Sequence, residues 1–245
     1  NIQAIEKGVP SLVAALADTP QASLDAAHAI LTTDLKVKEI AVTVELGGKT
    51  VTIGAIAKGS GMIHPNMGTM LCFLTTDCAI SSEMIKSALL ETVQVSFNRI
   101  SVDGDTSTND TCCVLANGLA GNPVITEKGP DYDAFVEALR ALCVELAKKM
   151  ASDGEGATHL ITCTVTGAGS EQSAETVAKS VIGSALTKAA IFGADANWCC
   201  APWAIPGRTS IRTRWMWPSR VRRAASRCAP RAGGWILMKI WPRGS

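Results

Sequence analysis

The acidic residues of this chain stop before residue 198, and that boundary limits how much of the sequence can share one fold. The first 197 residues hold all 22 Asp and Glu together with 13 Lys and Arg, a net charge of −9. Residues 198–245 hold nine Arg, one Lys and all six Trp, a charge of +10. Stretches that differ so much in composition rarely belong to one fold, so we expect the basic tail to be separate from the domain before it.

The overall composition predicts a buried core and excludes several classes of protein. Hydrophobic residues make up 47% and charged residues 18% of the 245 residues, which argues against disorder. The apolar runs are short, such as "MLCFL" at 70–74, whereas a membrane helix needs about 20 apolar residues. The nine Cys lack C-x-x-C spacing and the three His are scattered. We therefore expect reduced thiols in a cytoplasmic protein without a metal site.

Turn residues and hydrophobic periodicity predict an α+β fold in layers, without a regular βαβ repeat. Residues 39–59 alternate in polarity around Gly47-Gly48 and predict a β-hairpin. Residues 131–154 carry the clearest helical periodicity and end at a glycine. The other expected elements are two short helices within 10–31 broken at Thr19-Pro20, a strand at 69–80, a Ser-capped helix at 81–97, a polar loop leading into a strand or buried segment at 101–118, a strand at 158–168 and a helix at 173–193.

Two short polar motifs invite a ligand-binding interpretation, and both fail on spacing. "GGKT" at 47–50 ends like a phosphate-binding loop, but that motif needs Gly where this chain has Thr43, and it does not occur within a hairpin. "DGDTSTND" at 103–110 lacks the order of alternating ligands, Gly and distant Glu that a calcium loop requires. We interpret it as a loop of Asx and Ser/Thr turns.

The step Gly68-Thr69, between a glycine-rich loop and an apolar run, is a candidate for self-cleavage. The Thr69 hydroxyl can attack the preceding carbonyl in an N-to-O acyl shift, and water then hydrolyses the ester. Glycine before the nucleophile removes Cβ crowding and permits a strained backbone. The freed α-amine, whose ordinary pKa is about 7.7–8.0, can then act as general base for the hydroxyl of its own residue. By itself, a Gly-Thr step is a weak signal and is usually structural.

Longer segments around this step resemble, in their order, the ornithine acetyltransferase family (ArgJ family), the bifunctional glutamate N-acetyltransferases of arginine biosynthesis. The segments are "AILTTD" (29–34), "VTIGAIAKGSGMIHPNMGTML" (51–71), "SFNRISVDGDTSTNDT" (96–111), "LANG" (115–118), "DGEGATHLI" (153–161) and "KAAIFGADANW" (188–198). The resemblance covers residues 1–198. It implies an αββα-type fold of stacked β-sheets flanked by helices, as in ornithine acetyltransferase and DmpA-like proteins.

The resemblance also implies a precursor that cleaves itself between Gly68 and Thr69. Residues 1–68 would then be the C-terminal part of an α chain, and residues 69–198 the N-terminal part of a β chain. Thr69 would take the acetyl group from N2-acetylornithine and pass it to L-glutamate, in ping-pong transfer through an acetyl-threonine ester.

The substrate contacts of the family map onto Thr32, Lys58, Thr69 and Glu155. A lysine suits the substrate carboxylate, and a glutamate suits the ornithine ammonium. The first contact falls on either Thr32 or Thr33, and the spacing to Lys58 favours Thr32.

The family further implies an α2β2 heterotetramer with no metal or tightly bound cofactor and with no nucleic-acid or membrane partner. The residues leave open whether acetyl-CoA also serves as an acetyl donor. One alternative is a related N-terminal-nucleophile aminopeptidase or hydrolase, which would need no glutamate acceptor. Another is an inactive fragment whose basic tail binds nucleic acid with strong salt dependence.

Both ends of the chain depart from the family, and Gly68 stands where the family usually has alanine. The N-terminus "NIQAIEKGVPSLVAAL" has neither an initiator Met nor a signal-peptide layout, as if the chain were entered part-way. The Thr-Gly pair that forms the oxyanion hole in the family would lie upstream of it. Loss of an oxyanion donor typically costs about 10²–10³ in rate.

The tail after Trp198 departs most sharply, and we interpret residues 199–245 as a translation in the wrong reading frame. Read from the last base of the Trp198 codon, the codons of "CCAPWAIPG" can spell Val-Leu-Cys-Ala-Met-Gly-Tyr-Ser-Gly, the continuation that the family predicts. Resequencing the gene should therefore reveal a frameshift near this codon. An unchanged frame would show that the basic tail is genuine.

Overall fold

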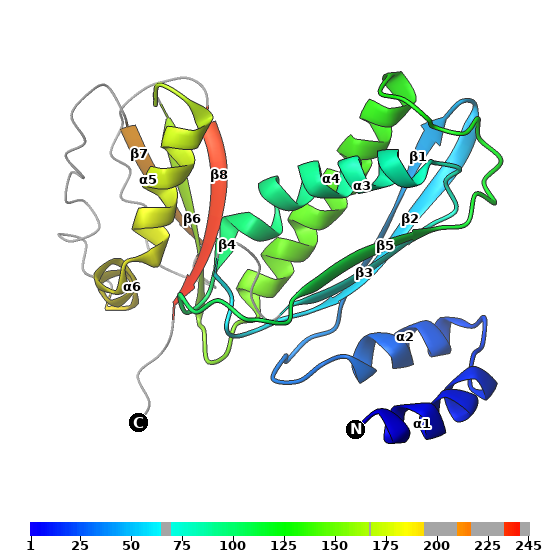
Figure 1. The fold of residues 1–245 in the computed structure, drawn as a ribbon. Helices are drawn as coiled ribbons and strands as arrows, with labels where there is room; N and C mark the ends of the chain where they lie inside the picture. The colour runs from blue at the N-terminus through cyan, green and yellow to red at the C-terminus, as the bar shows by residue number, and fades with distance from the viewer. Residues whose placement is uncertain (65–69, 167, 194–209, 217–232, 241–245) are drawn as a thin grey trace.

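The computed structural model describes residues 1–64, 70–166, 168–193, 210–216 and 233–240, the last two segments by their backbone alone. The described residues form an α+β fold, as the sequence predicts, in which two sheets are each flanked by helices (Figure 1). The helices are α1 (Ile2–Ala14), α2 (Pro20–Ala29), α3 (Ser82–Val95), η1 (Phe97–Arg99), α4 (Pro130–Ser152), α5 (Glu171–Gly183) and α6 (Ala185–Phe192). The strands are β1 (Lys38–Leu46), β2 (Lys49–Lys58), β3 (Leu71–Thr76), β4 (Ile100–Ser101), β5 (Thr111–Ala116), β6 (His159–Thr166), β7 (Ser210–Met216) and β8 (Gly233–Ile240).

The first sheet is built on the predicted hairpin and has the strand order β1-β2-β3-β5. Gly47 and Gly48 join β1 to β2 with φ angles of 54° and 75°, values that a two-residue hairpin turn requires and that glycine adopts readily. A Cβ on Gly47 would also lie 2.3 Å from Cδ of Pro123. β3 runs antiparallel to β2 and parallel to β5. The hairpin prediction is thus confirmed.

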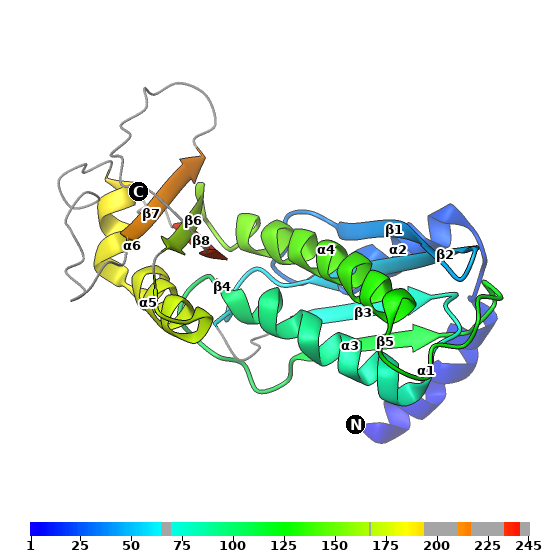
Figure 2. The same cartoon turned by 90° about the horizontal axis from the view of Figure 1, so that it is seen from above.

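Helices α3 and α4 cover one face of the first sheet and enclose the main core (Figures 1 and 2). The Ser81 side chain caps α3 by accepting a hydrogen bond from the Met84 amide, as predicted. The apolar residues of α4 recur at helical spacing, so one face of the helix is buried against the sheet. The fully buried side chains on that face include Phe135, Leu139, Leu142, Cys143, Leu146 and Met150.

The second sheet has the strand order β4-β8-β6-β7 and packs against α5. Alternate residues of β6 are buried against small and branched side chains of α5, in a second core cluster. The predicted helix at 173–193 is instead two helices, because Ser184 takes an extended conformation and its hydroxyl caps α6 at the Thr187 amide. β7 and β8 lie in the basic tail and pair with β6, so these two segments are not separate from the preceding residues as the composition predicts. The wrong-frame interpretation stays a prediction.

Helices α1 and α2 lie on the side of the first sheet opposite α3 and α4 (Figure 1). α1 starts earlier than the sequence predicts, continues through Pro10 and buries none of its side chains. Thr19 caps α2 and Pro20 is its first residue, so the predicted break at this dipeptide is confirmed. None of the helices in the described ranges is long and apolar enough to cross a membrane.

The packing of α4 predicts a large loss of stability when Phe135, which is 0% exposed, is replaced by alanine. We expect Phe135→Ala to lower the free energy of unfolding by about 3–5 kcal/mol, measured by urea denaturation, because the cavity can collapse only partly. The control Leu119→Ala, at a side chain that is 81% exposed, should change it by no more than about 0.5 kcal/mol. Similar losses in both variants would contradict this description of the core.

Candidate active site

Four segments that are distant in the sequence meet at one end of the first sheet and line a pocket of about 370 Å³. They are the loop after α2, the end of β2 with the loop that follows it, the loop after β4, and the turn after α4. The pocket is lined by Thr32, Thr33, Lys58, Ser60, Gly61, Met62, Asp103, Asp105 and Glu155. The structure therefore brings together Thr32, Lys58 and Glu155, three of the four positions that the sequence analysis selected.

Lys58 lies at the end of the first sheet where β3 begins, two residues after the proposed nucleophile. It is the last residue of β2 and pairs with Leu71, the first residue of β3. Its Nζ lies 3.4 Å from the Thr32 Oγ1, and the residue is only 8% exposed. None of the ion pairs found among the described residues includes Lys58. Its ammonium is thus able to pair with an anionic group of a ligand.

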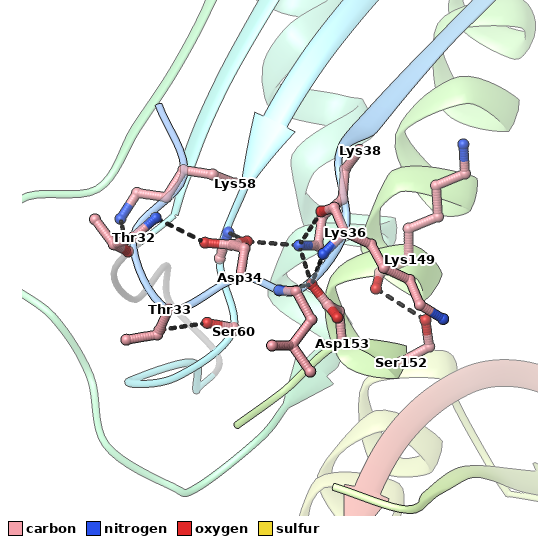
Figure 3. A network of polar contacts seen from close by, with 12 residues as sticks. Thr32, Thr33, Asp34, Lys36, Lys38, Lys58, Ser60, Lys149, Ser152 and Asp153 are labelled. Atoms are coloured by element: carbon pink, nitrogen blue, oxygen red, sulfur yellow. Dashed lines mark hydrogen bonds and ion pairs between the residues drawn. The ribbon is translucent and has the colours of Figure 1, made fainter. Parts of the chain in front are cut away.

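The two threonines of "TTD" have different partners. The Thr33 Oγ1 lies 2.6 Å from the Ser60 Oγ, so this hydroxyl ties the loop after α2 to the loop after β2. The Thr32 hydroxyl instead adjoins the Lys58 ammonium (Figure 3). This difference favours Thr32 as the substrate contact, as the spacing did, and the choice stays a prediction.

Glu155 is held against the loop after β2 by its backbone and by two glycines. Its amide donates to the Ser60 carbonyl at 2.8 Å. A Cβ on Gly61 would lie 3.1 Å from the Glu155 Oε1, and a Cβ on Gly154 would lie 2.8 Å from Cγ1 of Val102. A larger residue at Gly61 would push against the Glu155 carboxylate, and one at Gly154 would push against Val102 and the Ser60 carbonyl. The glycines of "KGSG" and "DGEG" therefore serve close packing between the two loops.

Acidic residues outnumber basic ones in the pocket lining, where Lys58 faces Asp103, Asp105 and Glu155. The sequence analysis missed Asp103 and Asp105 because it treated their loop as self-bonded. That interpretation is only partly confirmed: Asp103 accepts a hydrogen bond from the Asp105 amide within the loop, but also from the amides of Met62 and Ile63 outside it. The surplus of carboxylates favours a ligand that carries an ammonium group. Within the described residues, no group of three or more His, Cys, Asp and Glu could hold a metal ion.

Gly68 and Thr69 lie outside the described residues, and the chain is described again from Met70. Met70 is 2% exposed, and its amide, which is bonded to the Thr69 carbonyl carbon, donates to the Asp110 Oδ1 at 2.8 Å. The other carboxylate oxygen of Asp110 is buried without a hydrogen-bond partner. Burial raises the pKa of Asp110, although the Met70 amide and the Lys58 charge act in the opposite direction. The sequence analysis quoted Asp110 but gave it no role.

Comparison with known proteins shows similarity to one family over most of the chain. The sequence profile of the ArgJ family matches residues 1–214. The arginine biosynthesis bifunctional protein ArgJ of Symbiobacterium thermophilum is 55% identical over 194 residues, which are 79% of this chain and 48% of the relative. The protein with this description from Bacillus subtilis is 54% identical over 183 residues, 75% of this chain and 45% of the relative. The chain thus spans about half the length of these curated relatives.

A crystal structure of the arginine biosynthesis bifunctional protein ArgJ from Bacillus halodurans is also similar in fold. The two share 52% sequence identity and a TM-score of 0.50, over 52% of this chain and 60% of that one. The likeness agrees with the α+β fold expected from the sequence.

The environment of Asp34 predicts how acid affects stability. Burial raises the pKa of Asp34, but hydrogen bonds from Lys38 and the Gly59 amide, with the Lys38 charge, outweigh it and leave the pKa below its usual value. A lowered native pKa stabilises the fold above the unfolded value of about 3.9 and loses this effect as the pH falls through the native pKa.

We therefore expect the free energy of unfolding to decrease below about pH 4, and to decrease less in Asp34→Asn than in the wild type. Urea denaturation of both chains between neutral pH and the acid range measures the difference. An identical pH dependence in both would contradict the role assigned to Asp34.

Proposed function

The chain belongs to the ArgJ family, and we propose that it carries the nucleophile and part of the substrate pocket of an autoprocessed acetyltransferase. The enzyme would move an acetyl group from N2-acetylornithine to L-glutamate. The observation that supports this most is the meeting of Thr32, Lys58 and Glu155 in one pocket. That pocket lies beside β3, the strand that begins two residues after Thr69. We further propose the division into residues 1–68 of an α chain and residues 69–198 of a β chain.

Self-cleavage would create the catalytic group. The Thr69 Oγ attacks the Gly68 carbonyl carbon, the peptide C–N bond breaks, and the proton of the hydroxyl passes to the departing nitrogen. Water then hydrolyses the resulting ester, which leaves Thr69 with a free α-amine and a free hydroxyl. That amine is the general base for the transfer reaction.

Acetyl transfer would proceed in two half-reactions at the Thr69 hydroxyl. In the first, the α-amine removes the hydroxyl proton, the oxygen attacks the acetyl carbonyl of N2-acetylornithine, and ornithine leaves with the proton on its amine. In the second, the amine of glutamate attacks the acetyl-threonine ester and releases N-acetylglutamate. Each half-reaction forms one acyl bond and breaks another, so no further reactant is needed.

The pocket residues would select the substrate by charge. The Lys58 ammonium binds the α-carboxylate that donor and acceptor share, and the Thr32 hydroxyl adds a hydrogen bond to the same end. The Glu155 carboxylate binds the side-chain ammonium of the donor. Asp103 and Asp105 add negative charge around it, so the pocket favours the cationic ornithine side chain over a neutral one.

Further features of the whole enzyme are proposed from the family. They are an α2β2 heterotetramer, a cytoplasmic location, and a reaction without a metal or tightly bound cofactor. Acetyl-CoA as a second acetyl donor stays an open question. An aminopeptidase or hydrolase with the same nucleophile would release acetate or free amino acids and form no N-acetylglutamate, so the products distinguish it.

Intact mass and N-terminal sequencing of the purified chain test the first step. We expect two pieces, one of which begins Thr-Met-Leu-Cys-Phe, and transfer of acetyl from N2-acetylornithine to glutamate by the processed protein. Thr69→Ala should stay uncut and inactive, because it lacks the attacking hydroxyl. A folded wild-type chain that stays uncut, or a cut chain that forms no N-acetylglutamate, would overturn the proposal for this chain.

A further inference from the structure

Lys38 lies behind the pocket and has no role in the proposed chemistry, yet its environment is unusual for a lysine. Its side chain is 1% exposed, although lysine is rarely buried without partners. Each of its three ammonium hydrogens has an acceptor: the Asp34 Oδ1 at 2.5 Å, the Asp153 Oδ2 at 2.7 Å and the Lys36 carbonyl at 3.2 Å. Both carboxylates are also buried, at 0% and 3% exposed. The ammonium is therefore fully paired in a site closed to water.

The two carboxylates bind backbone amides of the segments that carry the pocket residues (Figure 3). Asp34 accepts from the Gly59 amide at 2.7 Å, directly after Lys58. Asp153 accepts from the amides of Leu35 and Lys36 at 3.0 and 3.1 Å. Glu155 follows Asp153 by two residues, and Thr32 precedes Asp34 by two. Through Lys38, one ammonium thus joins three of the four segments that line the pocket, all but the loop after β4.

The position of Asp153 explains why a positive charge is needed beside it. Asp153 is the C-cap of α4, where the helix dipole disfavours a negative charge. The Lys38 ammonium offsets both that effect and the repulsion between the two buried carboxylates. Without it, the two buried carboxylates would repel each other and move apart towards water, and the amides that they bind would be released.

We propose that Lys38 is a positioning residue of the acetyl-transfer reaction, which sets the distance between the Thr32, Lys58 and Glu155 contacts without touching the substrate. None of Lys38, Asp34 and Asp153 lines the pocket. The inference rests on the proposed function, because its effect is on substrate recognition. The test distinguishes a failure of this inference from a failure of the proposed function, because hydrogen exchange of the backbone amides can be measured without acetyl transfer.

The variants are Lys38→Met, which keeps the length of the side chain and removes the charge, and the milder Asp153→Asn. The matched control is Asn122→Ala, since Asn122 is also buried, at 5% exposed, and binds the backbone at Ala79, at the other end of the first sheet. All chains are compared at a temperature at which each remains folded. The readouts are KM and kcat with N2-acetylornithine, the rate of acetylation by p-nitrophenyl acetate, and hydrogen exchange of individual amides.

We expect Lys38→Met to raise KM for N2-acetylornithine by about tenfold, because the contacts no longer lie at matched distances. Acetylation by p-nitrophenyl acetate, which needs no recognition of an amino-acid side chain, should change by less than about twofold. Exchange at the amides of Gly59, Leu35 and Lys36 should become faster. Asp153→Asn should act in the same direction, and Asn122→Ala should accelerate exchange at Ala79 while leaving KM unchanged.

An unchanged KM in Lys38→Met would overturn the proposal, because the network would then serve stability alone. Equal losses with both acetyl donors would also overturn it, since they would indicate general damage to the nucleophile. If the wild-type chain transfers no acetyl group, the proposed function fails for this chain. The exchange measurement then tests only whether Lys38 holds the segments together. Unchanged exchange at the Gly59 amide would then show that Lys38 does not hold the segments together.

Discussion

The pocket depends on one buried ammonium group between two buried carboxylates. Taking these charges out of water is costly, and a buried ion pair is not by itself a source of stability. The cost is offset here because all three lysine donors are paired and because Asp34 and Asp153 each bind backbone amides as well. Removing one partner of such a cluster typically costs about 3–5 kcal/mol. The arrangement therefore penalises any movement that separates the three loops.

The first sheet supplies the rigid frame on which these loops meet. The hairpin of β1 and β2 places Lys38 and Lys58 at the same end of the sheet, on adjacent strands. Helix α4 crosses the sheet and ends at Asp153 beside them. β3 enters at that end too, with Met70 fixed by Asp110. β3 begins two residues after Thr69, and its first residue, Leu71, pairs with Lys58.

The sequence predicted the elements with strong local signals and missed features that depend on several segments. The Gly47-Gly48 turn, the Ser81 cap and the periodic face of α4 are local, and each was found. The break at Ser184 was missed although Gly183 and the capping hydroxyl of Ser184 both mark it, because the apolar residues on its two sides were interpreted as one helix. Asp103 and Asp105 were missed as pocket residues because nothing in a polar loop shows which surface it faces.

By itself, the sequence determined the fold class and the segments that resemble the ArgJ family, because these reside in periodicity and motif order. It also selected Thr32, Lys58 and Glu155, although only through the resemblance. Tertiary structure decided that these residues share a pocket, that Thr32 and Thr33 have different partners, and that Lys38 pairs with Asp153, 115 positions away. The physical reason is that burial and charge pairing are set by distant segments in contact, and no local pattern records which segments meet.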